Sequence, residues 1–160
     1  MTVPAAFCIG NARLVVPGEG TVSGGVRVVD GRIAEVGPGV RAAASETWVD
    51  ARGGLVTPGL IDVHTHGIHH FRYDAGPAEL RQAATRLAAY GCTCAYPTLI
   101  GKSDQAFLRL LSDTCGALDS VAGVSMPGVH LEGPFLAFTG AGCTLVLGDL
   151  GLLREMLAAG

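Results

Sequence analysis

The stretch that decides the fold is PGLIDVHTHG, residues 58–67. Its apolar run over residues 60–63 predicts a buried β-strand. The strand ends in His64 and His66, which are two residues apart, so both imidazoles are expected on the same face as Asp62. Because α/β barrels carry their chemistry at the carboxyl ends of the strands, we expect a site here.

Helices and strands alternate after this stretch. Residues 77–90 place apolar side chains on one helical face, with Pro77 at the start and Gly91 after the end. Similar patterns predict a strand over residues 93–99, a helix from the N-cap Ser103 to residue 118, a strand over 129–131 and a helix over 149–159. Strands that alternate with helices imply βαβ units and a parallel sheet.

The first third of the chain indicates a small β unit. Residues 26–29 and 32–36 are rich in apolar side chains and flank an Asp-Gly pair, which suits a two-residue hairpin turn with positive φ at both positions. We therefore predict two domains, a β-sandwich-like unit over residues 1–57 and an α/β unit over residues 58–160.

The length limits how much of a barrel the second unit contains. The chain has 160 residues, whereas a complete (β/α)8 barrel needs about 250. We therefore predict the α/β fold class, with about three βα units of a partial (β/α)8 TIM-type barrel after the small β unit. Hydrophobic residues make up 49%, charged residues 16% and the net charge is −3, which disfavours a disordered chain, a coiled coil and a basic nucleic-acid-binding domain.

The sequence favours a cytoplasmic setting without a membrane partner. Its start has no basic leader followed by an apolar block, and the longest uncharged run, residues 133–148, is too short to span a bilayer. The five cysteines have neither zinc-ribbon nor CxxC spacing, which suits a reducing compartment.

Glu132 carries the clearest sign of metal chemistry. It ends its strand in GVHLEGPF, and a carboxylate within an apolar run is costly to bury unless a cation or hydrogen bonds meet it. A metal ion satisfies this need, and the pair His64 and His66 supplies half of a zinc-type site. The alternatives are a glutamate that reaches solvent and a histidine pair in the core or in an exposed loop. His130 shares the face of Glu132 and either supports a ligand or lies in the core, and we favour the core. We interpret Asp74 as a solvated or turn residue rather than a catalytic one.

Three motifs, in this order along the chain, resemble the amidohydrolase superfamily and within it the N-acetylglucosamine-6-phosphate deacetylases. PGLIDVHTHG resembles the first barrel strand of the superfamily, and GCTCAYPTLI, residues 91–100, resembles its second strand segment. GVHLEGPFL, residues 128–136, discriminates among the subgroups, because the HLEGPF string is typical of the sugar deacetylases.

The resemblance implies a site for a divalent metal, zinc or alternatively iron, with one or two ions. Glu132 is then the main ligand, and His64 and His66 bind a second ion or lie beside the single one. In this family the metal activates a water for attack on the acetamide carbonyl, and an aspartate on the last barrel strand moves the proton. The implied substrate is a small amino-sugar phosphate, with glucosamine 6-phosphate and acetate as products.

Two loops depart from the family pattern. Residues 68–71, Ile-His-His-Phe, stand where the family is rich in glycine. The loop after HLEGPF matches the family at Gly140 and Ala141, which makes these two the candidate substrate-binding residues. Gly142 stands in place of a histidine that helps the family to hold its substrate.

The resemblance also assigns functional groups to barrel strands that this chain does not contain. The family takes two further metal-binding histidines from the fifth and sixth strands and its acid/base aspartate from the eighth. We therefore expect no catalytic acid or base in this chain and no activity of the chain alone. The rival hypotheses are a non-catalytic fragment, stable as a homo-oligomer or with a complementary chain, and an amidohydrolase with another amide substrate.

Overall fold

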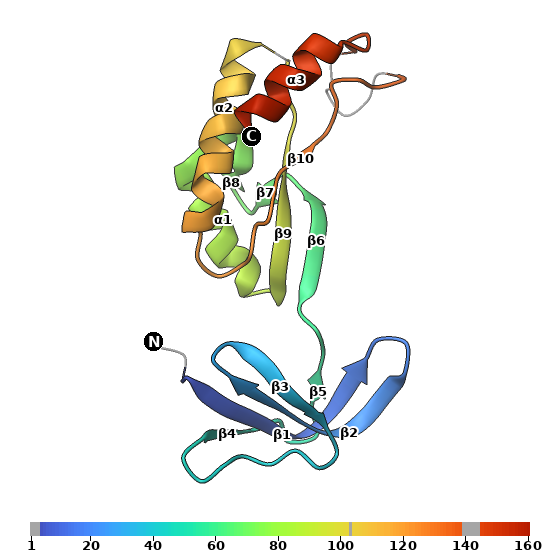
Figure 1. Cartoon of the computed structure of the whole chain (residues 1–160), viewed down its shortest axis with the longest axis vertical. Helices are drawn as coiled ribbons and strands as arrows, with labels where there is room; N and C mark the ends of the chain where they lie inside the picture. The colour runs from blue at the N-terminus through green and yellow to red at the C-terminus, as the bar shows by residue number, and fades with distance from the viewer. Residues whose placement is uncertain (1–3, 103, 139–144) are drawn as a thin grey trace. The chain divides into compact units, whose positions relative to one another are not determined.

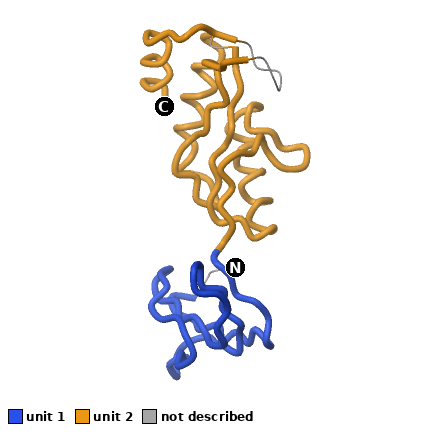
Figure 2. Tube along the Cα trace, turned by 90° about the vertical axis from the view of Figure 1, so that its right-hand side faces the viewer, with its two compact units in different colours: residues 1–58 blue, residues 59–160 orange. Residues whose placement is uncertain are grey.

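The computed structural model describes residues 4–102, 104–138 and 145–160. The chain divides into two compact units, Met1–Pro58 and Gly59–Gly160, which are coloured separately in Figure 2. The first unit consists of strands and turns, and the second combines strands with helices. The predicted mixed α/β character is confirmed.

The first unit is built on one five-stranded sheet within the described residues. Its strands follow the order β3-β2-β1-β4, and β5 pairs with the far part of β1. The strands are β1 (Ala6–Val16), β2 (Gly20–Val29), β3 (Arg32–Gly37), β4 (Thr47–Asp50) and β5 (Leu55–Val56). β2 and β3 form the predicted hairpin, and both turn residues have positive φ, 49° at Asp30 and 73° at Gly31. A small apolar cluster of Ala12, Leu14 and Val26 forms its core.

The second unit is organised around a parallel sheet with the order β10-β9-β6 in the described part of the chain. In Figure 1 the helices α1 and α2 lie on one side of this sheet and β6 forms its far edge. The small antiparallel pair β7 and β8 follows β6 directly. The elements are β6 (Leu60–Thr65), β7 (Gly67–Ile68), β8 (Phe71–Arg72), α1 (Pro77–Ala88), β9 (Cys92–Leu99), α2 (Gln105–Ala117), β10 (His130–Leu131) and α3 (Leu150–Ala159).

The core of the second unit lies between β9 and the helices. Leu80 and Ala84 of α1 pack with Leu99 of β9, and Leu111 of α2 and Met156 of α3 complete the cluster. These side chains recur at helical spacing on α1 and α2, so the amphipathic patterns in the sequence determine which helix faces are buried. The helices therefore bury the central strand β9, which pairs with both β6 and β10.

Helix α2 begins one residue later than predicted. Its N-cap is Asp104, whose carboxylate accepts a hydrogen bond from the backbone N–H of Phe107 at 2.9 Å. The predicted cap, Ser103, lies outside the described residues. A carboxylate at this position satisfies an otherwise unpaired helix N–H and also interacts favourably with the helix dipole.

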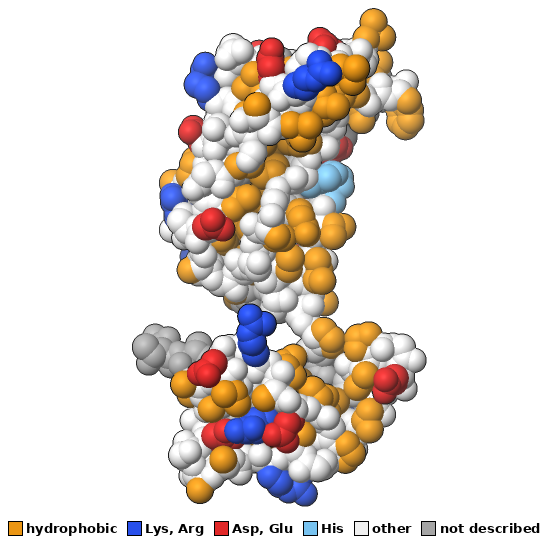
Figure 3. Space-filling view, viewed as in Figure 1, with side chains coloured by type: hydrophobic (Ala, Val, Ile, Leu, Met, Phe, Trp, Pro, Cys, Tyr) orange, Lys and Arg blue, Asp and Glu red, His pale blue; other side chains and the backbone are white. Residues whose placement is uncertain are grey.

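The prediction that residues 60–63 are buried is wrong. Leu60, Ile61 and Val63 are 62%, 66% and 63% exposed. The physical reason is their position, because β6 pairs only with β9 within the described residues and so has one uncovered edge. Figure 3 shows hydrophobic side chains at the surface over β6, next to exposed histidine.

None of the helices in the described ranges has the length and apolar character that crossing a membrane requires.

Candidate metal centre

The carboxyl ends of β6 and β10 bring three predicted site residues together. His64 lies in β6, His66 follows its last residue, and Glu132 follows directly after β10. Nε2 of His64 lies 3.2 Å from Oε2 of Glu132, and Nε2 of His66 lies 3.0 Å from the same oxygen. Two imidazoles from one strand end therefore point at one carboxylate oxygen from another.

This geometry fits a divalent metal ion. The three ligand atoms all lie within 4.8 Å of one another. Around a tetrahedral zinc with ligand distances of about 2.0–2.1 Å, neighbouring ligand atoms lie about 3.3 Å apart. The two histidine–glutamate separations of 3.0 and 3.2 Å are close to that value.

A local irregularity in β6 shapes the histidine end of the site. The pairing between β6 and β9 shifts register between Asp62 and Thr65, so the strand bulges where His64 lies. The carboxylate of Asp62 accepts a hydrogen bond from the backbone N–H of His64 at 3.2 Å. Asp62 therefore supports the bulge and is not a member of the three-residue ligand group.

The segment after His66 is anchored by a buried aromatic side chain. The backbone N–H of Tyr73 donates to the carbonyl of His66 at 3.1 Å, and the Tyr73 side chain is fully buried. Burial raises the pKa of the Tyr73 phenol, so the ring stays neutral in the core. This contact ties the second histidine to the core of the α/β unit.

Sequence reasoning missed the role of two further residues beside the ligands. His130 is only half-buried, and its ring centroid lies 4.8 Å from that of His64. Thr98 of β9 is buried, and its hydroxyl lies 3.1 Å from Nδ1 of His130. For Thr98, the sequence offered one signal, namely a polar residue near the end of the strand β9.

A cavity of about 410 Å³ opens beside His66. Its walls are formed by His66, Arg72, Asp74, Thr98 and Ile100. Arg72 and Asp74 form a two-pronged ion pair across it, with Nε 2.8 Å from Oδ1. Hydrogen bonding to Arg72 lowers the pKa of the Asp74 carboxyl. Asp74 is therefore an exposed, ion-paired residue of a 3-10 turn, in agreement with its interpretation as a solvated or turn residue.

The predicted substrate-binding residues Gly140 and Ala141 lie outside the described residues.

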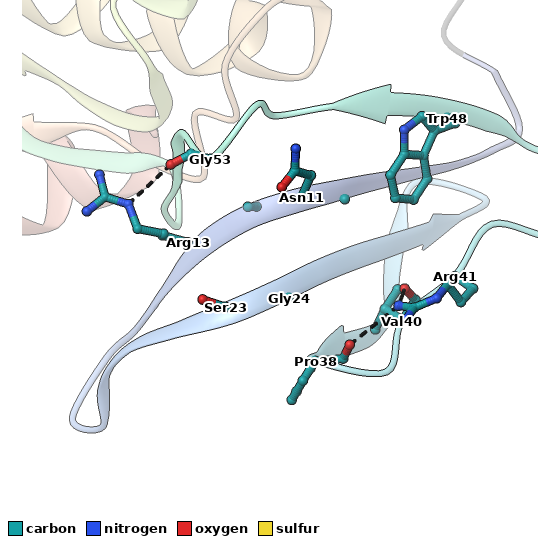
Figure 4. A pocket seen from close by; sticks show the side chains of 11 residues that line it. Asn11, Arg13, Ser23, Gly24, Pro38, Val40, Arg41, Trp48 and Gly53 are labelled. Atoms are coloured by element: carbon teal, nitrogen blue, oxygen red, sulfur yellow. Dashed lines mark hydrogen bonds between the residues drawn. The ribbon is translucent and has the colours of Figure 1, made fainter.

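A second pocket, in the β unit, offers no comparable group of ligands. Its volume is about 380 Å³, and Figure 4 shows its lining side chains. Nε of Arg13 donates to the carbonyl of Gly53 at 3.2 Å, and Arg41 donates to that of Val40 at 2.9 Å. Both guanidinium groups thus bind the walls of the pocket itself.

Comparison with known proteins shows similarity to several hydrolases. No protein-family model matches it. It is 29% identical to the N-acetylglucosamine-6-phosphate deacetylase of Bacillus subtilis over 143 residues, 86% of this chain and 36% of that protein. It is also 34% identical to the dihydroorotase of Solibacter usitatus over 108 residues, 62% of this chain and 23% of that protein. The chain is thus similar to two kinds of amidohydrolase, the sugar deacetylases and the dihydroorotases.

Solved structures show that the fold of the chain is similar to that of deacetylases. The N-acetyl-D-glucosamine-6-phosphate deacetylase of Mycobacterium smegmatis matches 96% of this chain with a TM-score of 0.78 and 24% identity. A mutant of that enzyme in complex with N-acetyl-D-glucosamine-6-phosphate matches 98% of the chain with a TM-score of 0.77 and 22% identity. The chain spans 44% and 41% of these two structures, and thus less than half of each.

Proposed function

We propose that this chain carries part of the metal centre of a deacetylase that hydrolyses the acetamide group of an amino-sugar phosphate, with N-acetylglucosamine 6-phosphate as the substrate. The observation that carries the proposal is the convergence of His64 and His66 on one carboxylate oxygen of Glu132. The similarity to deacetylases over 86% of the chain supports the substrate class.

The proposal includes a finer description of the fold. The α/β unit forms about three βα units of a (β/α)8 barrel, and the β unit forms part of a β-sandwich, with the boundary near Pro58. The deacetylase structures with TM-scores of 0.77 and 0.78 support this assignment. The proposal also assigns the protein to the cytoplasm.

The three side chains hold the ion, which we propose to be zinc, with iron as the alternative. When bound, such an ion lowers the pKa of a water and polarises the amide carbonyl. Each neutral imidazole offers its Nε2 lone pair, and Glu132 offers the negative charge that offsets part of the charge of the ion. Because these three residues form only part of the proposed metal centre, further ligand positions stay open for other protein ligands, water or substrate.

The described residues contribute no general acid or base to the proposed reaction. Asp74 is the carboxylate that lines the cavity beside His66. Its two-pronged pair with Arg72 lowers its pKa and holds the carboxylate ionised, which makes it a poor proton carrier near neutral pH. Turnover therefore needs groups from a complementary chain or from a second copy.

Isothermal titration with zinc tests the metal centre. We expect the wild-type chain to bind zinc and Glu132→Gln to bind it at least 10-fold more weakly, because the amide carries no negative charge. The matched control is Glu155→Gln, since Glu155 is an exposed glutamate on α3 outside the ligand group. Equal zinc affinity of the wild type and Glu132→Gln would count against the proposal.

Release of acetate from N-acetylglucosamine 6-phosphate tests the reaction. With zinc added, the chain alone is expected to give no turnover above a metal-free blank. Turnover typical of ordinary enzymes, about 10 per second, would contradict the assignment of the acid/base group to another chain.

A second candidate is the hydrolysis of a cyclic amide. The 34% identity to a dihydroorotase favours it. The same zinc-loaded preparation, mixed with extracts that supply a complementary chain, would be assayed with dihydroorotate beside the sugar phosphate. Hydrolysis of dihydroorotate alone would replace the deacetylase proposal.

A further inference from the structure

A single buried hydroxyl joins the two strand ends that carry the ligands. Thr98 lies near the end of β9, between β6 and β10, and is 1% exposed. Its Oγ1 accepts a hydrogen bond from the backbone N–H of Thr65 at 3.0 Å and lies 3.1 Å from Nδ1 of His130. One side-chain atom of the central strand therefore contacts both neighbours next to the site.

The contact with Thr65 replaces a backbone hydrogen bond in the disturbed part of β6. The register shift between Asp62 and Thr65 interrupts the regular ladder with β9. A backbone N–H that loses its partner inside a protein costs about 1–3 kcal/mol, so the hydroxyl stabilises the bulge. Because Thr65 stands between His64 and His66 in the chain, its position sets the position of both imidazoles.

The contact with His130 extends to the other histidine ring. A backbone N–H can only donate, so Oγ1 accepts from Thr65 and its own proton is available to Nδ1 of His130. The ring of His130 contacts that of His64, with centroids 4.8 Å apart. His130 also lies two residues before Glu132, so the same hydroxyl supports the carboxylate side of the site.

We propose that Thr98 is a positioning residue for the metal centre, because its hydroxyl holds the β6 and β10 ends at the separation that the ion requires. The proposal rests on the proposed metal-binding function. Residues that orient metal ligands by hydrogen bonds change metal affinity by about 10- to 100-fold when they are mutated. Thr98 does not touch the ion in this account.

The test compares Co²⁺ binding by the full chain and its variants, followed by visible absorption of the bound ion. Thr98→Val keeps the shape of the side chain but removes the hydroxyl, and we expect Co²⁺ affinity to fall about 10- to 100-fold with a changed spectrum. Thr98→Ser keeps the hydroxyl, and its affinity and spectrum should stay close to those of the wild type.

Thr114→Val is the matched control. Thr114 is a fully buried threonine in α2, and its hydroxyl has no hydrogen-bond partner among the described residues. The control therefore removes a buried hydroxyl from the same unit without touching the site, and Co²⁺ binding should not change. Urea unfolding of each metal-free variant checks that the variant is folded, so that differences in Co²⁺ binding do not come from unfolding.

Two results would overturn the proposal: unchanged Co²⁺ binding by Thr98→Val, or an equal loss in Thr98→Ser. Should Thr98→Val not fold, His130→Phe decides, since it keeps a ring beside His64 but removes the Nδ1 partner; affinity equal to that of the wild type would overturn the proposal. Failure of the wild type and of Thr114→Val to bind Co²⁺ would instead overturn the proposed metal centre itself.

Discussion

The neighbouring strands β6 and β9 have similar apolar sequences but opposite surroundings. In β9, Ala95 and Leu99 have no exposed surface, because helices α1 and α2 pack over this strand. In β6, Ile61 is 66% exposed, because the described residues cover it from one edge only. Position in the sheet, more than the composition of a strand, therefore decides burial. The two histidines of the proposed metal centre belong to the exposed strand end.

The largest expected effect is a difference in how strongly substitutions in the two strands lower the free energy of unfolding. Leu99→Ala should lower the free energy of unfolding by about 2–5 kcal/mol, because it opens a cavity in a closed core. Ile61→Ala should lower it by less than about 1 kcal/mol, because most of its side chain already contacts water. Urea unfolding of the two variants measures the difference. An equal loss would show that β6 is covered in solution.

A bound metal ion should have a smaller effect on the free energy of unfolding. The ion would link the end of the exposed strand β6 to the end of β10. At 100 times its dissociation constant, zinc should raise the free energy of unfolding of the wild type by about 2.7 kcal/mol. His66→Asn should lose most of this gain, because it removes one ligand. His70→Asn is the control, since His70 is an exposed histidine outside the ligand group. Loss of the gain in both variants would argue against the assigned ligands.

The exposed edge of β6 also predicts self-association. We expect the wild type to form homo-oligomers and Ile61→Lys to be monomeric, because a lysine on an edge strand opposes pairing with another strand. Leu157→Lys, which changes a residue of α3 that is 71% exposed, should remain oligomeric. Light scattering after size-exclusion chromatography measures the mass. A monomeric wild type would show that β6 does not drive association.

The smallest effect concerns Asp74, beyond the end of β6. Arg72 lowers the pKa of this carboxyl in the folded chain, so the pair stabilises the fold above the unfolded pKa of about 3.9, and this contribution is lost as the pH falls through the folded value. Arg72→Gln should reduce stability at pH 7 only slightly, since the pair is largely exposed and screened by solvent. Urea titrations at pH 7 and near pH 2 measure this, and a larger loss at the lower pH would contradict the assignment.

Local patterns predicted much of the fold because their causes are local. The positive φ values at Asp30 and Gly31 follow from the turn that these residue types favour. The buried faces of α1 and α2 follow from helical spacing. The exposure of Ile61 could not be predicted in this way, because it depends on what covers β6 and not on the strand itself.

The residues of the candidate site also differ in whether the sequence alone could predict them. His64, His66 and Glu132 could be selected from the sequence, because ligand-type residues stood at the ends of apolar strands. Thr98 could not, because its contacts with Thr65 and His130 depend on the register of three strands and on the bulge in β6. Hydrogen bonds across strands leave no periodic signal in a single sequence.

The most direct test of the central claim is X-ray absorption at the zinc edge of the zinc-loaded chain. We expect two imidazole nitrogens and a carboxylate oxygen at about 2.0–2.2 Å, with the imidazole signals reduced in His66→Asn. Sulfur at about 2.3 Å would mean that cysteines bind the ion, and a shell without imidazole would exclude His64 and His66; either result would contradict the account.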